Sequence, residues 1–252
     1  MKNNKKRSFP FRPALLLGAA AVLLLGSTVG STRAALTYYS ENYAAQVNMS
    51  SIGVALLENG EEVSSRDYLE SGEWAEAQGE LLTNMLAEGE KFSPGKAYPE
   101  ALSVANTGNI DTFVRVIITK SWQDKNGVKS TALDPDLIQL NLTGDNGWVL
   151  DGSQTYSPER LVLYYTEVLE PGMMTEALSD TIRIDPQIAR EVEIVQEGNT
   201  IRYEYRYDGY RFCLEAEVNA VQTHNAGDAI KSAWGVDVTL SEDGTSITGV
   251  SH

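Results

Sequence analysis

The feature that most constrains the fold is an alternation of apolar and polar residues with a period of two. It is clearest over residues 201–218, where aromatic and aliphatic residues alternate with charged ones on either side of Asp208-Gly209. A period of two is the repeat of a β-strand with one buried face, and Asp-Gly supplies the positive φ angles that a type I′ turn needs. The pattern predicts a β-hairpin that turns at Asp208-Gly209.

Turn dipeptides divide the rest of the chain into short segments: Asn59-Gly60, Asn126-Gly127, Asn146-Gly147, Gly198-Asn199 and Asp243-Gly244. Between them we expect strands at residues 52–57, 102–105, 113–120, 137–142, 148–150, 161–165, 181–184, 191–195 and 236–240. Many short strands without a strand–helix alternation predict an all-β, mainly antiparallel sandwich or barrel.

Two apolar stripes at helical spacing interrupt this pattern. The first comprises Trp74, Leu81, Leu82, Met85 and Leu86 and ends near Gly89. The second follows Asn225, a residue type favoured at N-caps, and runs from Ala226 to Trp234 before Gly235. We expect two short helices that decorate the sandwich and turn these stripes toward its core.

The N-terminus has the organisation of a secretory signal peptide. A basic segment is followed by a thirteen-residue apolar run, residues 14–26, which is shorter than the roughly 20 residues of a membrane-spanning helix. Thr32 and Ala34 offer small side chains at the −3 and −1 positions of a cleavage site, so we expect cleavage after Ala34, or else after Ala35. The alternative is an uncleaved N-terminal anchor. We expect residues 1–34 to be the signal peptide and residues 35–252 to form a single secreted domain.

The remaining chain is strongly acidic. Residues 1–34 carry six basic side chains and no acidic one, so their removal changes the formal net charge from −15 to −21. Such a chain repels nucleic acid and anionic lipid surfaces. We therefore expect no nucleic-acid partner, and contact with a membrane only through an uncleaved signal peptide. Cys213 is the only cysteine, which excludes a disulfide scaffold.

No pattern of catalytic or metal-binding residues stands out. The chain has two histidines, His224 and His252, and no His-Glu-x-x-His, Gly-x-Ser-x-Gly, phosphate-binding or dinucleotide-binding motif. Cys213 with His224 is the one Cys–His combination to consider for nucleophilic catalysis, and we interpret Cys213 as a structural thiol. We predict no enzymatic activity and no cofactor.

Three further features have structural interpretations. Residues 124–127 and 134–136 superficially resemble calcium loops but lack the ligand spacing of an EF-hand. We expect both to be turns. Arg115, within the apolar run 113–118, is expected to be half-buried and paired with a carboxylate.

Three segments resemble the TasA/camelysin family of exported Firmicute proteins. Gly-Ser-Thr-Arg-Ala-Ala-Leu-Thr-Tyr-Tyr at residues 30–39 is similar to the family's processing junction. Pro94-Gly95-Lys96, followed by Leu102-Ser-Val-Ala-Asn-Thr-Gly-Asn at residues 102–109, resembles its Pro-Gly, strand, Asn-x-Gly passage. The Gln-plus-Ala-rich segment 220–235 is similar to its closing helix.

This resemblance implies a jelly-roll-like β-sandwich, processing by a SipW-type signal peptidase, and a place in cell-surface fibres or a biofilm matrix. It also implies that the segment Ala35–Ser50, with Leu36, Tyr38, Tyr39, Tyr43 and Val47, completes the sheet of a neighbouring subunit. The partners would be other copies of the chain or related matrix proteins. Alternatively, this segment is the first strand of its own sandwich.

Two other functions stay open at this point. The camelysin branch of the family implies a secreted metalloendopeptidase, although this sequence lacks the histidine and carboxylate ligand pattern. A monomeric module that binds a glycan or a host protein through exposed tyrosines near Tyr203–Tyr210 is the third hypothesis.

Overall fold

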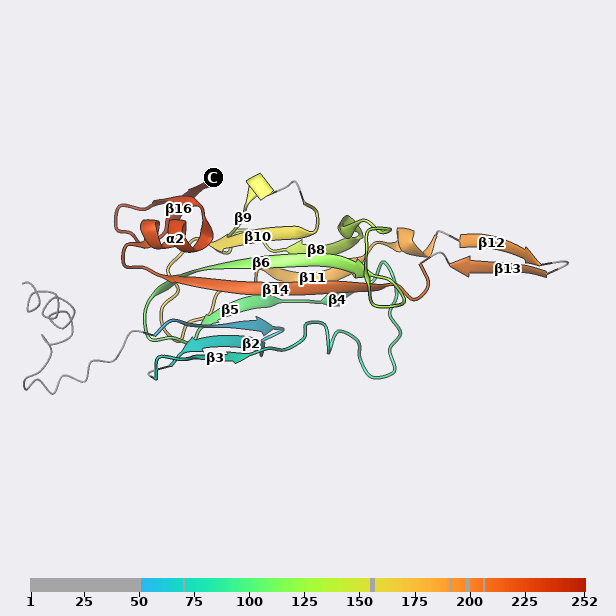
Figure 1. Ribbon diagram of the computed structural model, residues 1–252, viewed down its shortest axis with the longest axis horizontal. Coiled ribbons are helices and arrows are strands. Elements are labelled where there is room, and N and C mark those ends of the chain that lie inside the picture. The colour runs from blue at the N-terminus through green and yellow to red at the C-terminus, as the bar shows by residue number, and fades with distance from the viewer. Residues whose placement is uncertain (1–50, 70, 155–156, 191, 198–199, 206) are drawn as a thin grey trace, which may run out of the picture. The chain divides into compact units, whose positions relative to one another are not determined.

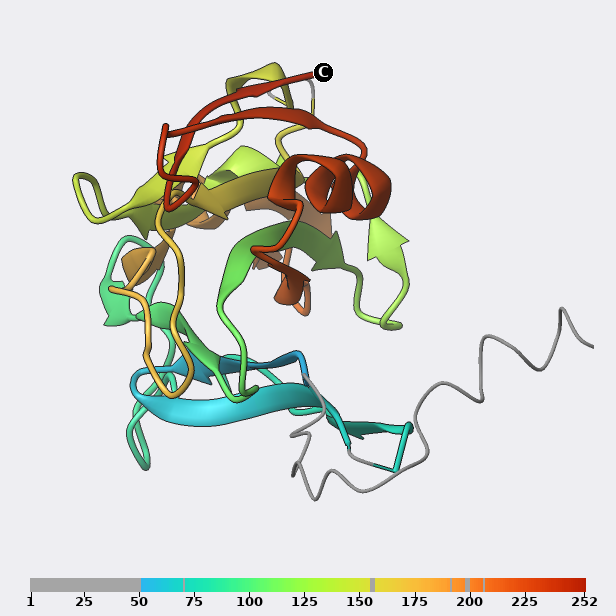
Figure 2. The same cartoon turned by 90° about the vertical axis from the view of Figure 1, so that its left-hand side faces the viewer.

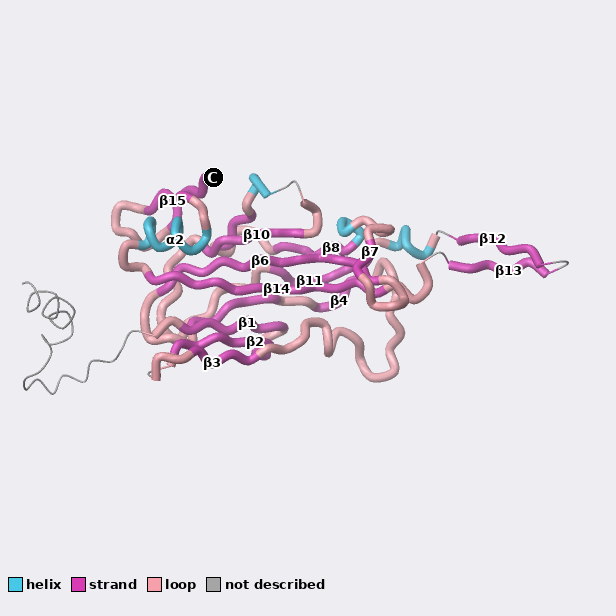
Figure 3. The backbone as a smooth tube through the Cα atoms, viewed as in Figure 1, coloured by secondary structure: helices cyan, strands magenta, loops and turns pink. Residues whose placement is uncertain are grey.

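The computed structural model describes residues 51–69, 71–154, 157–190, 192–197, 200–205 and 207–252. These residues belong to one compact unit, Met49–His252, in which strands predominate (Figures 1 and 3). Every strand pair among them is antiparallel. The predicted all-β, mainly antiparallel class is confirmed.

The first sheet has the strand order β3-β2-β1-β5. β1 and β2 are joined by Asn59 and Gly60, whose φ angles are 52° and 88°. Positive φ at both central residues defines the type I′ turn that the dipeptide predicts. The bounds are Gly53–Glu58 for β1, Glu61–Tyr68 for β2, Trp74–Ala77 for β3 and Leu102–Asn106 for β5.

The second sheet has the order β14-β6-β10-β9, with the short β7 beside the end of β6. Its two long strands, β6 and β14, pair over twelve residues, from Arg211 opposite Gln123 to Gln222 opposite Thr112. The bounds are Thr112–Gln123 for β6, Lys129–Ser130 for β7, Trp148–Leu150 for β9, Arg160–Tyr165 for β10 and Arg211–Gln222 for β14.

A third sheet extends the first one. It has the order β4-β11-β8, with bounds Ala97–Pro99, Ser179–Ile184 and Ile138–Leu142. Residues 172–178, which precede β11, run along β5 and donate three main-chain hydrogen bonds to it: Gly172 to Asn106, Thr175 to Val104 and Leu178 to Leu102. The first and third sheets therefore form one continuous layer that faces the second sheet.

The main core lies between these two layers. One face of β6 supplies Val114, Val116, Ile118 and Trp122, which pack against residues of the opposite layer such as Val104 and Ile182. Burial of side chains of this size contributes about 1.5–3 kcal/mol each. Figure 2 shows the arrangement, with β1 and β2 in one layer and β6 with β10 in the other.

The opposite face of β6 is covered as well. Phe113 and Ile117 form a second cluster with helix α2, Ala226–Trp234, and with the hairpin of β15, Asp237–Leu240, and β16, Ile247–Ser251. Both faces of β6 are thus buried. This explains why residues 113–118 read as an almost continuous apolar run rather than as a strict alternation.

Helix α2 confirms one of the two predicted helices. It begins after Asn225 and ends at Gly235, which has a φ angle of 74°. Asn225 is the N-cap, but its own backbone is left-handed and its side chain makes no capping hydrogen bond. The remaining helical turns in the described ranges are three short 3-10 helices: η1 at Pro135–Leu137, η2 at Gly152–Gln154 and η3 at Pro186–Ala189.

The second predicted helix, over residues 74–89, is wrong. Trp74 begins strand β3, which pairs with β2, and the leucines that follow lie in turns whose side chains pack partly buried on the main core. A Cβ on Gly79 would lie 2.3 Å from the carbonyl oxygen of Val63, and Leu82 has a φ angle of 66°. Helical spacing of apolar residues here reflects a loop folded onto the core.

The hairpin predicted at Asp208-Gly209 is also wrong. Gly209 has a φ angle of 81°, and the amide of Tyr210 donates to the carbonyl of Tyr207, so a turn does form there. However, β13, Thr200–Tyr205, pairs with β12, Val192–Glu197, while β14 pairs with β6. The twelve-residue ladder with β6 outweighs the local pairing. Gly198-Asn199, between β12 and β13, lies outside the described residues.

We expect Gly147→Ala to destabilise the fold more than Gly127→Ala, by about 1–3 kcal/mol. Both glycines have left-handed φ angles, 84° and 78°, so both substitutions carry the same backbone penalty. A Cβ at position 147 would lie 2.6 Å from Tyr165, whereas nothing lies within 4 Å of one at position 127. Urea unfolding of the two variants measures the difference. Equal losses would contradict the packing of Tyr165 against this turn.

Candidate functional site

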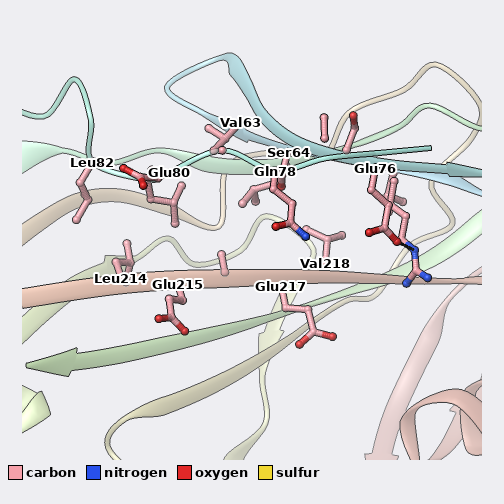
Figure 4. A pocket seen from close by; sticks show the side chains of 18 of the residues that line it. Val63, Ser64, Glu76, Gln78, Glu80, Leu82, Leu214, Glu215, Glu217 and Val218 are labelled. Carbon is pink, nitrogen blue, oxygen red and sulfur yellow. Dashed lines mark ion pairs between the residues drawn. The ribbon is translucent and has the colours of Figure 1, made fainter. Parts of the chain in front are cut away.

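Among the described residues, a groove runs along one side of the sandwich. It has a volume of about 710 Å³ and runs between β14 and the opposing segments of β2, β3 and residues 78–82. Figure 4 shows these two walls with the gap between them.

The floor of the groove is apolar because strands alternate. On β14, Leu214 and Val218 point into the gap, while Glu215 and Glu217 point away from it (Figure 4). From the other wall, Gln78 points toward them, and Val63 belongs to the same lining. The apolar lining continues into the main core. It is completed by six further residues: Val54, Leu56, Leu81, Leu82, Phe212 and Ala216.

The rim of the groove is polar. Arg66 forms an ion pair with Glu76, with 2.9 Å between Nε and Oε1, and both side chains are about half exposed. The Arg66 guanidinium also lies over the Trp74 ring, 4.4 Å from its centroid. Because the pair is exposed, it contributes at most about 1 kcal/mol. The pair links β2 to β3, where Arg66 and Glu76 lie opposite each other.

Both walls end in strand edges. In the described part of the chain, β14 pairs with β6 only and β3 with β2 only. In an antiparallel strand, alternate residues direct their N–H and C=O groups toward opposite sides. β14 therefore presents a row of unpaired main-chain donors and acceptors beside an apolar groove. Its sequence contains no proline or glycine that would interrupt pairing with a further strand.

Cys213 lies on the outer face of β14 and is half-buried. Burial raises the pKa of its thiol and the charge of Glu215 raises it further, while Arg211 and a hydrogen bond with Ser121 act in the opposite direction. His224 is exposed beyond the far end of the same strand. The strand from Cys213 to Gln222 alone spans roughly 30 Å, so the two side chains do not meet.

Residues 124–127 form a turn, as predicted, whereas residues 134–136 begin the 3-10 helix η1. Asp124 accepts hydrogen bonds from the amides of Asn126 and Val128, and Asp134 caps η1 through the amide of Asp136. Within the described ranges, no three His, Cys, Asp or Glu side chains gather in a way that could hold a metal ion.

The prediction for Arg115 is half right. The side chain is half-buried, but its hydrogen bonds to the described residues go to an amide oxygen and a main-chain carbonyl rather than to a carboxylate: Nε donates to Asn219 Oδ1 and Nη1 to the Trp234 oxygen. The guanidinium also lies 5.2 Å from the centroid of the Trp234 ring. Arg115 thereby ties α2 to the second sheet.

The structure describes the side chains of only some of the tyrosines in the surface-module hypothesis. Tyr207 and Tyr210 pack partly buried against the main core and form an edge-on ring pair. The side chains of Tyr203 and Tyr205 lie outside the described residues. So do the predicted cleavage residues Thr32, Ala34 and Ala35 and the predicted donor residues Leu36, Tyr38, Tyr39, Tyr43 and Val47.

Sequence reasoning missed a smaller hollow of about 440 Å³ between β9, β10 and β16. At its edge, Asp151 Oδ2 lies 2.8 Å from His252 Nε2, and Asp151 Oδ1 accepts from Ser153. Burial raises the pKa of Asp151, and the hydrogen bonds from Ser153 and His252 more than offset this, so the net change is a lowering. The contact holds the end of β16 against β9; no motif in the sequence indicated it.

Comparison of the chain with protein-family models, curated proteins and solved structures gave no match. Among the described residues, no helix is long and apolar enough to cross a membrane. The groove and the free edge of β14 are therefore the features on which a functional proposal can rest.

Because its pKa is raised, the Cys213 thiol should reach its full alkylation rate at a higher pH than a free thiol does. Glu215→Gln removes one cause of the shift and should move the rate profile to lower pH. The exposed Glu242, at the β15–β16 turn, provides the control substitution Glu242→Gln. The check is the pH dependence of the iodoacetamide reaction. A profile at or below that of a free thiol would contradict the assigned environment.

Proposed function

We propose that this protein is an exported structural subunit that assembles outside the cell by strand donation. Residues 35–50 of one copy would add to the free edge of β14 in the next copy and fill the groove beside it. The observation that carries this proposal is the coincidence of an apolar groove with a twelve-residue edge that has no partner strand among the described residues. The resemblance to fibre-forming members of the TasA/camelysin family supports the same assignment.

Strand addition suits this site energetically. The added strand would form main-chain hydrogen bonds with β14, and side chains on its inner face would replace water in the groove. The part of β14 that lines the groove is Phe212–Asn219, eight residues or about 27 Å of strand. A donor of seven or eight residues matches this length.

The segment 43–49 has the pattern that such a donor needs. Tyr43, Ala45, Val47 and Met49 alternate with Ala44, Gln46 and Asn48. In an extended conformation the first set would face the groove and the second set the solvent. The predicted cleavage after Ala34 would leave this segment close to the new N-terminus.

Strand donation between copies explains assembly without closure. Donor and acceptor are different surfaces of the subunit, so each added copy leaves one donor and one acceptor unused. A head-to-tail contact of this kind produces an open filament unless its rotation closes a ring. We therefore propose a place in cell-surface fibres or an extracellular matrix, with a SipW-type signal peptidase as the processing partner and related matrix proteins as further contacts.

Two substitutions should inactivate the donor segment and the acceptor groove separately. Val47→Asp places a charge on the inner face of the donor, and Ala216→Trp fills the groove. Each variant, made in the polypeptide that begins at residue 35, should remain monomeric. Every contact needs an intact donor on one copy and an intact acceptor on the other. An equimolar mixture should form one-to-one dimers and stop there, because each copy supplies the surface that the other lacks.

Sedimentation velocity with electron microscopy of the same samples measures these outcomes. Two matched control variants should still form filaments. Gln46→Asp changes a donor residue that would face the solvent, and Val149→Trp changes an exposed residue of β9. A chain that retains its leader should not assemble. Monomers from the unmodified chain that begins at residue 35, or no dimers from the mixture, would overturn the proposal.

A further inference from the structure

Two glutamate side chains are buried together at the end of the groove, where β1 meets the β4–β5 connection. Glu100 is fully buried and Glu58 is 8% exposed. Neither carboxyl oxygen of Glu100 receives a hydrogen bond from the described residues. A buried carboxylate without a donor is costly, so the pair needs an explanation.

A shared proton supplies the missing interaction. The pKa of Glu100 is raised to about 8, mainly by burial, and the charge of Glu58 and the hydrogen bond with its side chain act in the same direction. Protonated Glu100 can donate a hydrogen bond to the carboxylate of Glu58. Two ionised carboxylates have no proton with which to form such a bond. A divalent cation such as calcium needs six to eight oxygen ligands, and the described residues gather no third carboxylate here.

The other charged groups on the surrounding elements are engaged elsewhere. Lys96 pairs with Glu90, the Asp180 carboxylate accepts from Asn141 and Thr181, and the Tyr98 hydroxyl accepts from the amide of Ser93. Glu61, opposite Glu58 on β2, and Glu88, on the loop, are exposed. Glu58 is thus the neighbouring ionisable group that raises the pKa of Glu100.

Glu58 also holds one wall of the groove. Its Oε1 accepts a hydrogen bond from the amide of Leu82, with 2.6 Å between nitrogen and oxygen. Leu81 and Leu82 line the groove, and Leu82 is kept in a left-handed backbone conformation, at a φ angle of 66°. For a leucine this conformation costs roughly 1–2 kcal/mol by steric clash alone, so the bond to Glu58 opposes a real tendency to relax.

We propose that Glu58 and Glu100 form a proton-dependent latch that fixes the Leu81–Leu82 wall of the groove. With one proton shared, the pair is stable and Glu58 remains in place to bind the Leu82 amide. When Glu100 ionises, repulsion between two buried carboxylates drives them apart and releases this wall. The effect on strand docking rests on the function proposed above, whereas the latch itself does not.

The direction of the pH effect follows from the raised pKa. The folded state holds the Glu100 proton more tightly than the unfolded chain, whose ordinary value is 4.5. The stabilisation is complete below about pH 4.5 and is lost as the pH rises through about 8. The latch is therefore closed in acid and neutral conditions and open in alkali.

Hydrogen exchange of the Leu82 amide tests the latch directly, with each rate corrected for the intrinsic exchange rate at that pH. We expect its protection factor to fall by roughly tenfold between pH 6 and pH 9. Glu100→Gln keeps a hydrogen-bond donor toward Glu58 but cannot ionise, so its protection factor should stay constant. Glu88→Gln, on the exposed part of the same loop, should behave like the unmodified chain.

Peptide binding separates this proposal from the previous one. A synthetic peptide of residues 35–50, added to the Val47→Asp chain, should bind more weakly at pH 9 than at pH 6, and Glu100→Gln should abolish the difference. No peptide binding at either pH would refute strand docking and leave the latch standing. A Leu82 protection factor that is equal at pH 6 and pH 9, or that falls equally in Glu100→Gln, would overturn the latch.

Discussion

The ladder between β6 and β14 is the interaction on which the rest of the structure depends. β6 is buried on both faces: one face forms the main core with the opposite layer, and the other forms the second cluster with α2 and the β15–β16 hairpin. A strand in this position can pair on both sides and pack on both faces. Its twelve-residue register with β14 fixes where the C-terminal elements lie, and Arg115 ties α2 to this sheet through Asn219 and the Trp234 carbonyl.

The same ladder creates the candidate site. β14 is as long as β6 but, in the described part of the chain, has no partner on its other side. Natural proteins usually shorten, cover or charge such an edge. Here the carboxylates of Glu215 and Glu217 point away from the groove (Figure 4), so they protect the outer face and leave the edge and the apolar floor accessible. An edge of this kind is unfavourable for an isolated subunit and suitable for one that receives a strand.

Local signals in the sequence predicted much of the fold. Asn59-Gly60 was correctly predicted as a turn because its backbone preference needs no distant partner, and residues 113–120 were correctly predicted as a strand. The hairpin predicted at Asp208-Gly209 failed, although a turn forms there, because β14 pairs with β6, which is far away in sequence. The helix expected at 74–89 failed because helical spacing does not distinguish a helix from a loop that packs leucines onto a core. The groove and the Glu58–Glu100 pair could not be predicted, since each joins residues from segments far apart in the chain.

Amide hydrogen exchange along β14, compared between monomer and filament, tests the central claim most directly. If a strand from another copy occupies the free edge, alternate amides within residues 212–219 should become protected on assembly, while the amides already bonded to β6 change little. Filaments in which β14 exchanges as it does in the monomer, with new protection on another surface, would contradict strand addition at this edge.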